Sequence, residues 1–241
     1  MSSPSGTAVG IVSDLWRYPV ASMGGERLRR AFLGPLGVLG DRRCMVADPA
    51  DDSAVIALRN PPLLAYRAWC DDAQGGDDVR VETPRGDVVA WDDPSLAEGI
   101  RADIERDERE PVELRRSPAG AHADQPVALL AESTITQVSG WAGEDVDRRR
   151  FRPNVVIDAG DDPFPEDSWM GRRLVIGDGA EIEVVAPTRR SGVLSRDPDT
   201  AERDTRAHAA LARERRNYAG ACCRVVRPGW IAVGDAVRVS G

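Results

Sequence analysis

The sequence predicts a mainly β protein that folds as two lobes with a few helices. Short segments that are apolar, or that alternate between apolar and polar residues, recur through both halves of the chain, which is typical of small barrels. Turn-forming residues such as Gly24-Gly25 and Pro84-Arg85-Gly86 separate these segments. A charged stretch with helical spacing divides the two halves, and 241 residues suffice for one large core or two smaller ones.

The first lobe is expected to be a small β-barrel domain that spans residues 1–92. Strands are expected at residues 9–15, 43–48, 54–58, 79–83 and 88–91, because each is short, rich in apolar residues and bounded by turn formers. Aspartate-rich segments at the edges of these strands predict solvated loops.

A helical linker over residues 93–115 is expected to follow. Asp93 and Pro94 have the residue types that favour an N-cap and a first helical turn. Leu96, Ile100 and Ile104 then recur at every fourth residue, which indicates one buried face. The charged run at 101–110 is interpreted as a solvated linker, and Pro111 and the turn at 117–120 are expected to close the connector.

The second lobe, residues 116–241, is expected to be a second barrel. Strands are predicted at residues 127–130, 154–157, 173–176 and 182–185, with the turn at 177–181 joining the last two as a hairpin. Helices are predicted to begin near Ser133 and to span 201–216. The final segment predicts a hairpin of residues 230–233 and 236–239 around Gly234-Asp235.

Composition excludes several classes of function. With 32 Lys and Arg against 40 Asp and Glu, the net charge of −8 disfavours binding to nucleic acid or to an anionic membrane. The basic residues are nearly all arginine, which suits anion recognition, although a GC-rich genome would give the same bias. Four cysteines and two histidines lack zinc or iron-sulfur spacing, so any electrons must come from another protein. No secretion signal or membrane-spanning run is evident, which predicts a soluble cytoplasmic protein.

Four motifs carry the functional information. The first half contains YPVASMGG from residue 18 and LGDRRCMVAD from residue 39; the second contains RFRPNVVID from residue 150 and APTRRSGVLSRDPDT from residue 186. Arg150, Arg152 and Asn154 are spaced by two, so they would share one face of an extended segment. By itself that spacing also fits a pair of solvent-facing arginines. PFPEDSW, residues 163–169, is interpreted as a structural loop that Trp169 anchors against the barrel.

In order and spacing these motifs resemble the MOSC domain family with its N-terminal β-barrel domain, and within it the branch that includes the mitochondrial amidoxime reducing component. The resemblance implies a pocket between two β lobes that binds the molybdenum cofactor. It implies that Ser22, Arg42, Arg152, Asn154 and Arg190 contact that cofactor. Where the family usually has a lysine that helps to hold the cofactor phosphate, this chain has Ala21.

Ser191 stands where the family usually has the cysteine that ligates molybdenum. A thiolate is a soft ligand that forms at modest cost, whereas a serine hydroxyl is far harder to deprotonate. A bound cation can nevertheless stabilise an alkoxide, so Ser191 is the expected catalytic and metal-binding residue. The alternative is that Ser191 is an ordinary loop hydroxyl in a protein that has discarded the metal. Arg190, Asp197 and Thr200 keep their expected places, which predicts that the loop folds as in the family.

The resemblance implies a molybdenum-cofactor oxidoreductase that reduces N-oxygenated small molecules such as hydroxylamines and amidoximes, with electrons from a separate protein. One alternative is a MOSC-fold protein without molybdenum that catalyses a metal-free reaction on an anionic small molecule, or binds one, for example in secondary metabolism. Another is a cofactor carrier, which needs affinity for the pterin phosphate but no metal ligand. GxSxG and a glycine-rich nucleotide loop are both missing from the sequence, which argues against hydrolase and nucleotide-binding chemistry.

Overall fold

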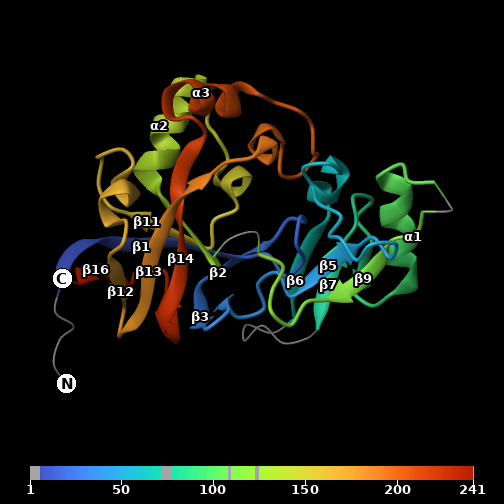
Figure 1. The fold of residues 1–241 in the computed structure, drawn as a ribbon, viewed down its shortest axis with the longest axis horizontal. Helices are drawn as coiled ribbons and strands as arrows, with labels where there is room; N and C mark the ends of the chain where they lie inside the picture. The colour runs from blue at the N-terminus through green and yellow to red at the C-terminus, as the bar shows by residue number, and fades with distance from the viewer. Residues whose placement is uncertain (1–5, 72–77, 108–109, 123–124, 241) are drawn as a thin grey trace.

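The computed structural model describes residues 6–71, 78–107, 110–122 and 125–240, and it is a mainly β protein of two lobes (Figure 1). One lobe, on the left of the view, is a closed barrel with helices α2 and α3 at one end. The other lobe consists of small separate sheets and helix α1 (Pro94–Asp103). The predicted fold class is confirmed.

Seven strands form the barrel in the order β11-β10-β14-β13-β12-β16-β1, and β1 pairs again with β11 to close it. Closure leaves no free edge in the ring. Neighbours are antiparallel except β10 and β11, which run parallel with Leu129 opposite Val155, and helix α2 lies in the crossover that parallel strands require. The strands are β1 (Thr7–Arg17), β10 (Val127–Ala131), β11 (Val155–Asp158), β12 (Arg173–Ile176), β13 (Ala180–Arg189), β14 (Tyr218–Arg227) and β16 (Ala236–Ser240).

Strand β1 connects the two ends of the sequence, because it belongs to the first half of the chain yet completes the barrel of the second. It pairs with β11 through Leu15 opposite Val155, and with β16 through Thr7 opposite Val239. Gly10 allows this close approach, since a Cβ atom there would overlap the carbonyl oxygen of Asp158. The barrel therefore forms only when residues far apart in sequence have met.

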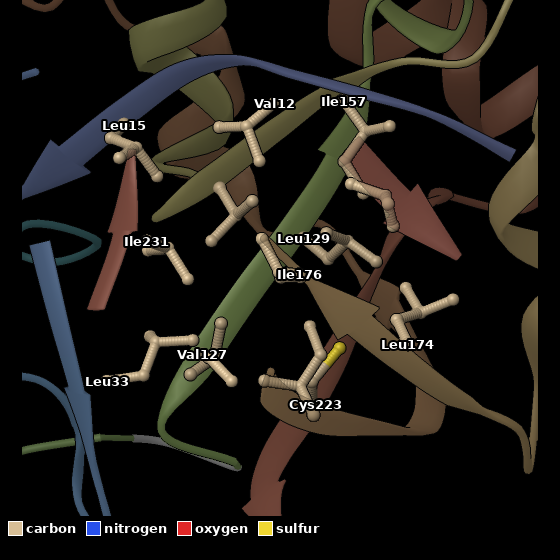
Figure 2. Packing of buried hydrophobic residues seen from close by; sticks show 14 of the residues in the cluster. Val12, Leu15, Leu33, Val127, Leu129, Ile157, Leu174, Ile176, Cys223 and Ile231 are labelled. Carbon is tan, nitrogen blue, oxygen red and sulfur yellow. The ribbon is translucent and has the colours of Figure 1, made fainter. Parts of the chain in front are cut away.

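The barrel core contains apolar side chains from every strand (Figure 2). Leu129, Leu174 and Ile176 are fully buried, and Trp169 packs against the same cluster. Each fully buried Leu or Ile side chain contributes about 1.5–3 kcal/mol relative to an exposed one. The expectation that Trp169 anchors its loop against the barrel is confirmed.

The other lobe consists of small sheets around its own core. The core contains Trp91, Tyr66 and Ile100, and Ala201 from the second half of the chain also joins it. β5 pairs with β9, and the order β6-β7-β8 forms a second sheet. A third small sheet, β15-β3-β4, with β15 spanning Gly229–Ala232, packs on the barrel core instead, through Leu33, Val38 and Ile231. The elements of this lobe are β5 (Cys44–Ala47), β6 (Arg67–Cys70), β7 (Val79–Glu82), β8 (Val88–Ala90), β9 (Glu113–Arg116) and the 3-10 helix η1 (Pro61–Ala65). The elements beside the barrel are β2 (Glu26–Leu28), which pairs with β1, β3 (Arg30–Gly34) and β4 (Gly37–Val38).

The predicted linker helix is α1, and it begins as expected. The Asp93 side chain accepts a hydrogen bond from the Ser95 N–H at 2.9 Å, and Leu96 and Ile100 are buried. The helix ends at Asp103, and the segment predicted as the rest of a connector contains strand β9, which pairs with β5. β9 is only four residues long and has Leu114 as its one apolar residue. The sequence therefore carries no signal that this segment pairs as a strand.

Two further predictions about elements are wrong. Residues 54–58 make one bridge, from Ala54 to Ala47, and then form a turn rather than a strand. The final two strands do not form a hairpin: β15 (Gly229–Ala232) pairs with β3, and β16 pairs with β1 and β12. The predicted turn at Gly234-Asp235 is present, and the Asp235 N–H donates to the Ala232 carbonyl. The two strands on either side of this turn pair with other strands and not with each other.

Helices α2 (Glu132–Ala142) and α3 (Arg206–Arg215) cover one end of the barrel (Figure 1). They pack with Phe151, Leu194 and Leu211 into a third apolar cluster. The predicted start of α3 was too early, because residues 197–204 form turns and a bridge between Arg196 and Arg203. In the part of the chain that the structure describes, no helix is long and apolar enough to cross a membrane.

Candidate functional site

A cavity of about 290 Å³ lies at the end of β13, beside the middle of β14, the start of β10 and the segment just before β11. Five of the six predicted site residues line it. They are Arg42, Arg152, Asn154, Arg190 and Ser191. His122, Arg150, Thr188 and Cys222 line the same cavity. Five segments that are distant in sequence therefore converge on one arginine-rich space.

Arg152 enters the cavity because the backbone turns sharply there. The 3-10 helix η2 (Arg148–Phe151) ends at Arg152, whose φ of 50° is left-handed. Its Nη1 donates to the Met23 carbonyl at 2.6 Å, and its guanidinium lies 4.3 Å from the centre of the Tyr18 ring. Burial and the nearby Arg42 guanidinium lower the pKa of Arg152 to about 10. An anion beside Arg152 would oppose both effects, because a nearby negative charge raises the pKa of a guanidinium.

Arg190 is held by two backbone carbonyls just beyond the end of β13. Nε donates to Ala219 at 2.8 Å and Nη1 donates to Phe151 at 2.6 Å. Burial lowers the pKa of Arg190 to about 10, and the Glu166 carboxylate opposes that shift. Among the described residues, neither Nη2 of Arg190 nor Nη2 of Arg152 has a hydrogen-bond partner. Two buried cationic donors are thus left for a ligand.

Arg42 and Asn154 form a linked pair at the wall of the cavity. Arg42 is ion-paired with the buried Asp41, and its Nη1 lies 3.4 Å from the Asn154 Oδ1. Asn154 is 0% exposed; Oδ1 also accepts from the Ala128 N–H at 3.0 Å, and Nδ2 donates to the Trp16 carbonyl at 3.3 Å. The Asn154 amide therefore fixes β10 against β1 as well as facing the cavity.

Ser191 is exposed and is the N-cap of the 3-10 helix η4 (Gly192–Ser195). Its hydroxyl accepts a hydrogen bond from the Val193 N–H at 3.4 Å, which is a long and weak contact. A hydroxyl keeps a second lone pair and its own proton beyond this bond. Ser191 thus has a local structural role and retains the capacity to bind a further group.

Ser22 lies outside the cavity. It adopts a left-handed φ of 70°, and its hydroxyl accepts a hydrogen bond from the Ala57 N–H at 3.0 Å. That bond holds the turn at 54–58 against the loop that follows β1. The structure therefore gives Ser22 a loop-fixing contact and does not bring it together with the other five predicted residues.

A second cavity of about 490 Å³ adjoins the first, and Arg150, Arg152 and Val193 line both. Its other walls include Tyr18 and Arg67, and also Arg196 and residues 198–200. The Tyr18 hydroxyl is buried and has no partner in the described part of the chain. Burial raises the pKa of Tyr18, so its hydroxyl stays protonated and can donate.

The loop after η4 is folded by its own side chains. The Asp197 carboxylate accepts from the N–H groups of Asp199 and Thr200 at 2.9 Å each, and from the Thr200 hydroxyl at 3.2 Å. These bonds lower the pKa of Asp197. Asp197 and Thr200 therefore shape this wall of the larger cavity.

Several residues at or near the site were not singled out from the sequence. His122 is half-buried, and this burial together with the nearby Arg42 lowers its pKa, so the neutral form is favoured at physiological pH. Glu166 lies behind Arg190 and accepts hydrogen bonds from the Ala131 N–H and the Thr134 hydroxyl, each at 2.7 Å. Glu166 belongs to the PFPEDSW loop, where a carboxylate between Pro165 and Asp167 resembles an ordinary solvated residue. His122 had no local motif.

No group of three or more His, Cys, Asp or Glu side chains is arranged to hold a metal ion within the described residues. Ser191 lines the smaller cavity and supplies a hydroxyl there.

Comparison with known proteins covers both lobes. The family model for the MOSC domain matches residues 112–238, and the model for the MOSC N-terminal beta barrel domain matches residues 9–118. Mitochondrial amidoxime-reducing component 1 of Homo sapiens is 26% identical over 80% of this chain and 68% of its own length. The Mus musculus protein of that name is 25% identical over 80% of this chain and 67% of its own length.

A solved structure also shares the fold. The YUAD protein from Bacillus subtilis superposes with a TM-score of 0.52 at 12% identity, over 95% of this chain and 94% of that one. At this identity the similarity concerns the fold alone.

Proposed function

Because the chain belongs to the MOSC family, we propose that it is an oxidoreductase that binds the molybdenum cofactor in the arginine-lined cavity and reduces N-oxygenated small molecules, such as hydroxylamines and amidoximes. The relatives named as amidoxime-reducing support the substrate class.

One observation carries the proposal: Arg152 and Arg190 line one cavity, and each has a buried guanidinium nitrogen, Nη2, without a hydrogen-bond partner among the described residues. A buried charged donor without a partner is costly, so such groups are usually satisfied by another protein group, water, an ion or a ligand. A phosphate offers several anionic oxygens, and charge-assisted hydrogen bonds to it are about twice as strong as neutral ones. The donor set therefore fits the phosphate of a pterin cofactor.

The remaining roles follow from position. Arg42 adds positive charge to the same cavity, and its ion pair with Asp41 holds it there. Ser191 is the candidate protein ligand to the metal, and its weak contact with Val193 can be given up at small cost. When bound, the cofactor supplies two-electron oxygen-atom transfer, while the protein supplies binding, orientation and electrostatics.

The larger cavity is the candidate substrate site, because it adjoins the first along Arg150 and Arg152. The Tyr18 hydroxyl can donate to a substrate oxygen or nitrogen there. Electrons would come from a separate protein, since the cysteines lack the spacing of an iron-sulfur cluster.

The test is turnover of benzamidoxime by the purified full chain, with a reduced viologen dye in place of the protein donor. The proposal predicts that benzamidine forms in step with dye oxidation and in proportion to bound molybdenum. Turnover absent from molybdenum-loaded protein, with a range of hydroxylamines and amidoximes, would contradict it.

A second candidate function is a metal-free one, in which the same cavity binds or converts an anionic small molecule. Two observations favour it: the Ser191 hydroxyl is already used as a cap, and Ala21 replaces a cationic residue of the family motif. A cofactor carrier would retain pterin without turnover. Metal, pterin and turnover measured on one preparation separate the three functions.

A further inference from the structure

Cys222 and Cys223 are adjacent on β14, yet their surroundings differ completely. Successive residues of a strand point to opposite faces. Cys223 is 0% exposed and lies in the barrel core near Val127, where Figure 2 shows its sulfur among apolar side chains. Cys222 points the other way and lines the arginine-rich cavity, with 8% of its surface exposed.

The wall around Cys222 is built for an anion. The Arg190 guanidinium lies within electrostatic range of the Cys222 thiol, and its Nη2 has no partner within the described residues. His122 also lines this cavity; its side chain is 9% exposed, and its Nε2, which lies against Gly120, has no hydrogen-bond partner among the described residues. Arg42 and Arg152 add further positive charge.

None of the other described cysteines lies in such a place. Cys44 and Cys70 belong to the core of the other lobe, and Cys223 to the barrel core. Burial raises the pKa of Cys223, which disfavours its reactive thiolate form. Cys222 alone among the four combines access to a cavity with neighbouring guanidinium groups.

We propose that Cys222 is a nucleophilic thiol that reacts covalently with small anionic electrophiles, whose carboxylate the arginines of this cavity hold. In the reaction, the sulfur forms a bond to an electrophilic carbon, the leaving group departs with its bonding electron pair, and the thiol proton passes to solvent. No metal, oxidant or reductant is needed. The inference therefore goes beyond the proposed reductase function and does not depend on it.

The test compares two alkylating agents that differ in charge. The native full chain, produced in a host that cannot make molybdopterin, is treated briefly with iodoacetate or iodoacetamide, and each cysteine peptide is quantified by mass spectrometry. Iodide is the leaving group in both reactions. Cavities lined by one sign of charge raise the local concentration of counter-ions by about tenfold or more. The preference of Cys222 for iodoacetate should therefore exceed that of free N-acetylcysteine by at least about tenfold.

Variants and a competitor make the assignment specific. Cys222→Ser should abolish fast labelling, whereas Cys223→Ala should leave it intact. Arg190→Gln should bring the charge preference close to that of N-acetylcysteine. Inorganic phosphate should slow alkylation by iodoacetate in the unmodified chain, which provides the same test if Arg190→Gln fails to fold.

Two outcomes would overturn the inference: a native chain in which Cys222 stays unlabelled, or equal labelling by the two reagents relative to the free thiol. Neither outcome bears on the reductase function, which is measured as bound molybdenum and turnover. Conversely, fast anion-selective labelling in a chain that never binds molybdenum would support the inference while the reductase function fails.

Discussion

At the scale of single residues, the central question is whether Ser191 does more than cap η4. Its hydroxyl makes one long bond to Val193 and is otherwise exposed toward the cavity. Breaking this weak hydrogen bond costs little free energy, so the Ser191 hydroxyl can turn to bind a metal.

If Ser191 ligates the metal, Ser191→Ala should lower dye-linked turnover by at least about 100-fold, since even residues outside a metal's ligand set affect activity 10–100-fold. Ser191→Cys should retain or raise turnover, because a thiolate forms more easily than an alkoxide. Both variants should unfold thermally close to the wild type. Ser168→Ala, another exposed serine in a 3-10 helix, is the control. Equal turnover in Ser191→Ala would remove Ser191 from the metal.

Glu166 gives a second prediction at this scale. It is 1% exposed and accepts hydrogen bonds from the Ala131 N–H and the Thr134 hydroxyl. Glu166→Ala leaves that buried N–H without a partner and should lower the free energy of unfolding by about 1–3 kcal/mol. Urea unfolding of both proteins measures the difference, and an unchanged midpoint would contradict the role of Glu166.

The same carboxyl predicts a pH dependence. Burial raises the pKa of Glu166 above its ordinary value, so the folded state binds more protons than the unfolded state in the interval between the two values. The contribution of Glu166 to stability is therefore largest below about pH 4.3 and decreases as pH rises through its folded pKa. Relative to Glu166→Gln, the wild type should be more stable near pH 4 than near pH 7. A stability advantage of the wild type over Glu166→Gln that grows as pH rises would contradict the raised pKa of Glu166.

At the scale of elements, the sequence predicted strands with strong local signals and missed those defined by distant partners. β10, β11, β12 and the start of α1 lie close to their predicted positions, because apolar runs and the Asp93 cap are local features. β9 and the partners of β15 and β16 depend on long-range pairing that a four-residue segment does not encode. β13 extends to Arg189, which is why Arg190 reaches the cavity.

The turn between β3 and β4 gives a prediction at this scale. Gly37 has a φ of +92°, and a Cβ atom there would overlap the carbonyl oxygen of Pro126, just before β10. Gly86 has a similar φ of +88°, with no atom within 4 Å of the added Cβ. Backbone strain of this kind costs about 1–3 kcal/mol. Gly37→Ala should therefore lower the melting temperature more than Gly86→Ala does, because only Gly37→Ala adds a steric overlap. An equal decrease in melting temperature for the two variants would contradict the prediction, since it would show that the backbone at Gly37 can shift to relieve the overlap.

At the scale of the whole molecule, the cavity is formed by segments that lie far apart in the sequence and belong to different motifs or to none. The motifs identified Arg42, Arg152, Asn154, Arg190 and Ser191, and the structure brings these five together. Ser22 came from the same motifs but fixes a loop instead. His122 and Cys222 join the site only through tertiary structure, because each is an isolated residue type without a spacing rule. The sequence also could not indicate that β1 completes the barrel of the other half.

The measurement that tests the account most directly is the amount of molybdenum and released pterin, per mole of protein, in chain produced by a host that makes the cofactor. The account predicts near-stoichiometric amounts of both in the wild type and a large loss of pterin in Arg190→Gln. Arg213→Gln, which alters an exposed arginine paired with Glu214, should match the wild type. Absence of both molybdenum and pterin from the folded wild type would contradict the account.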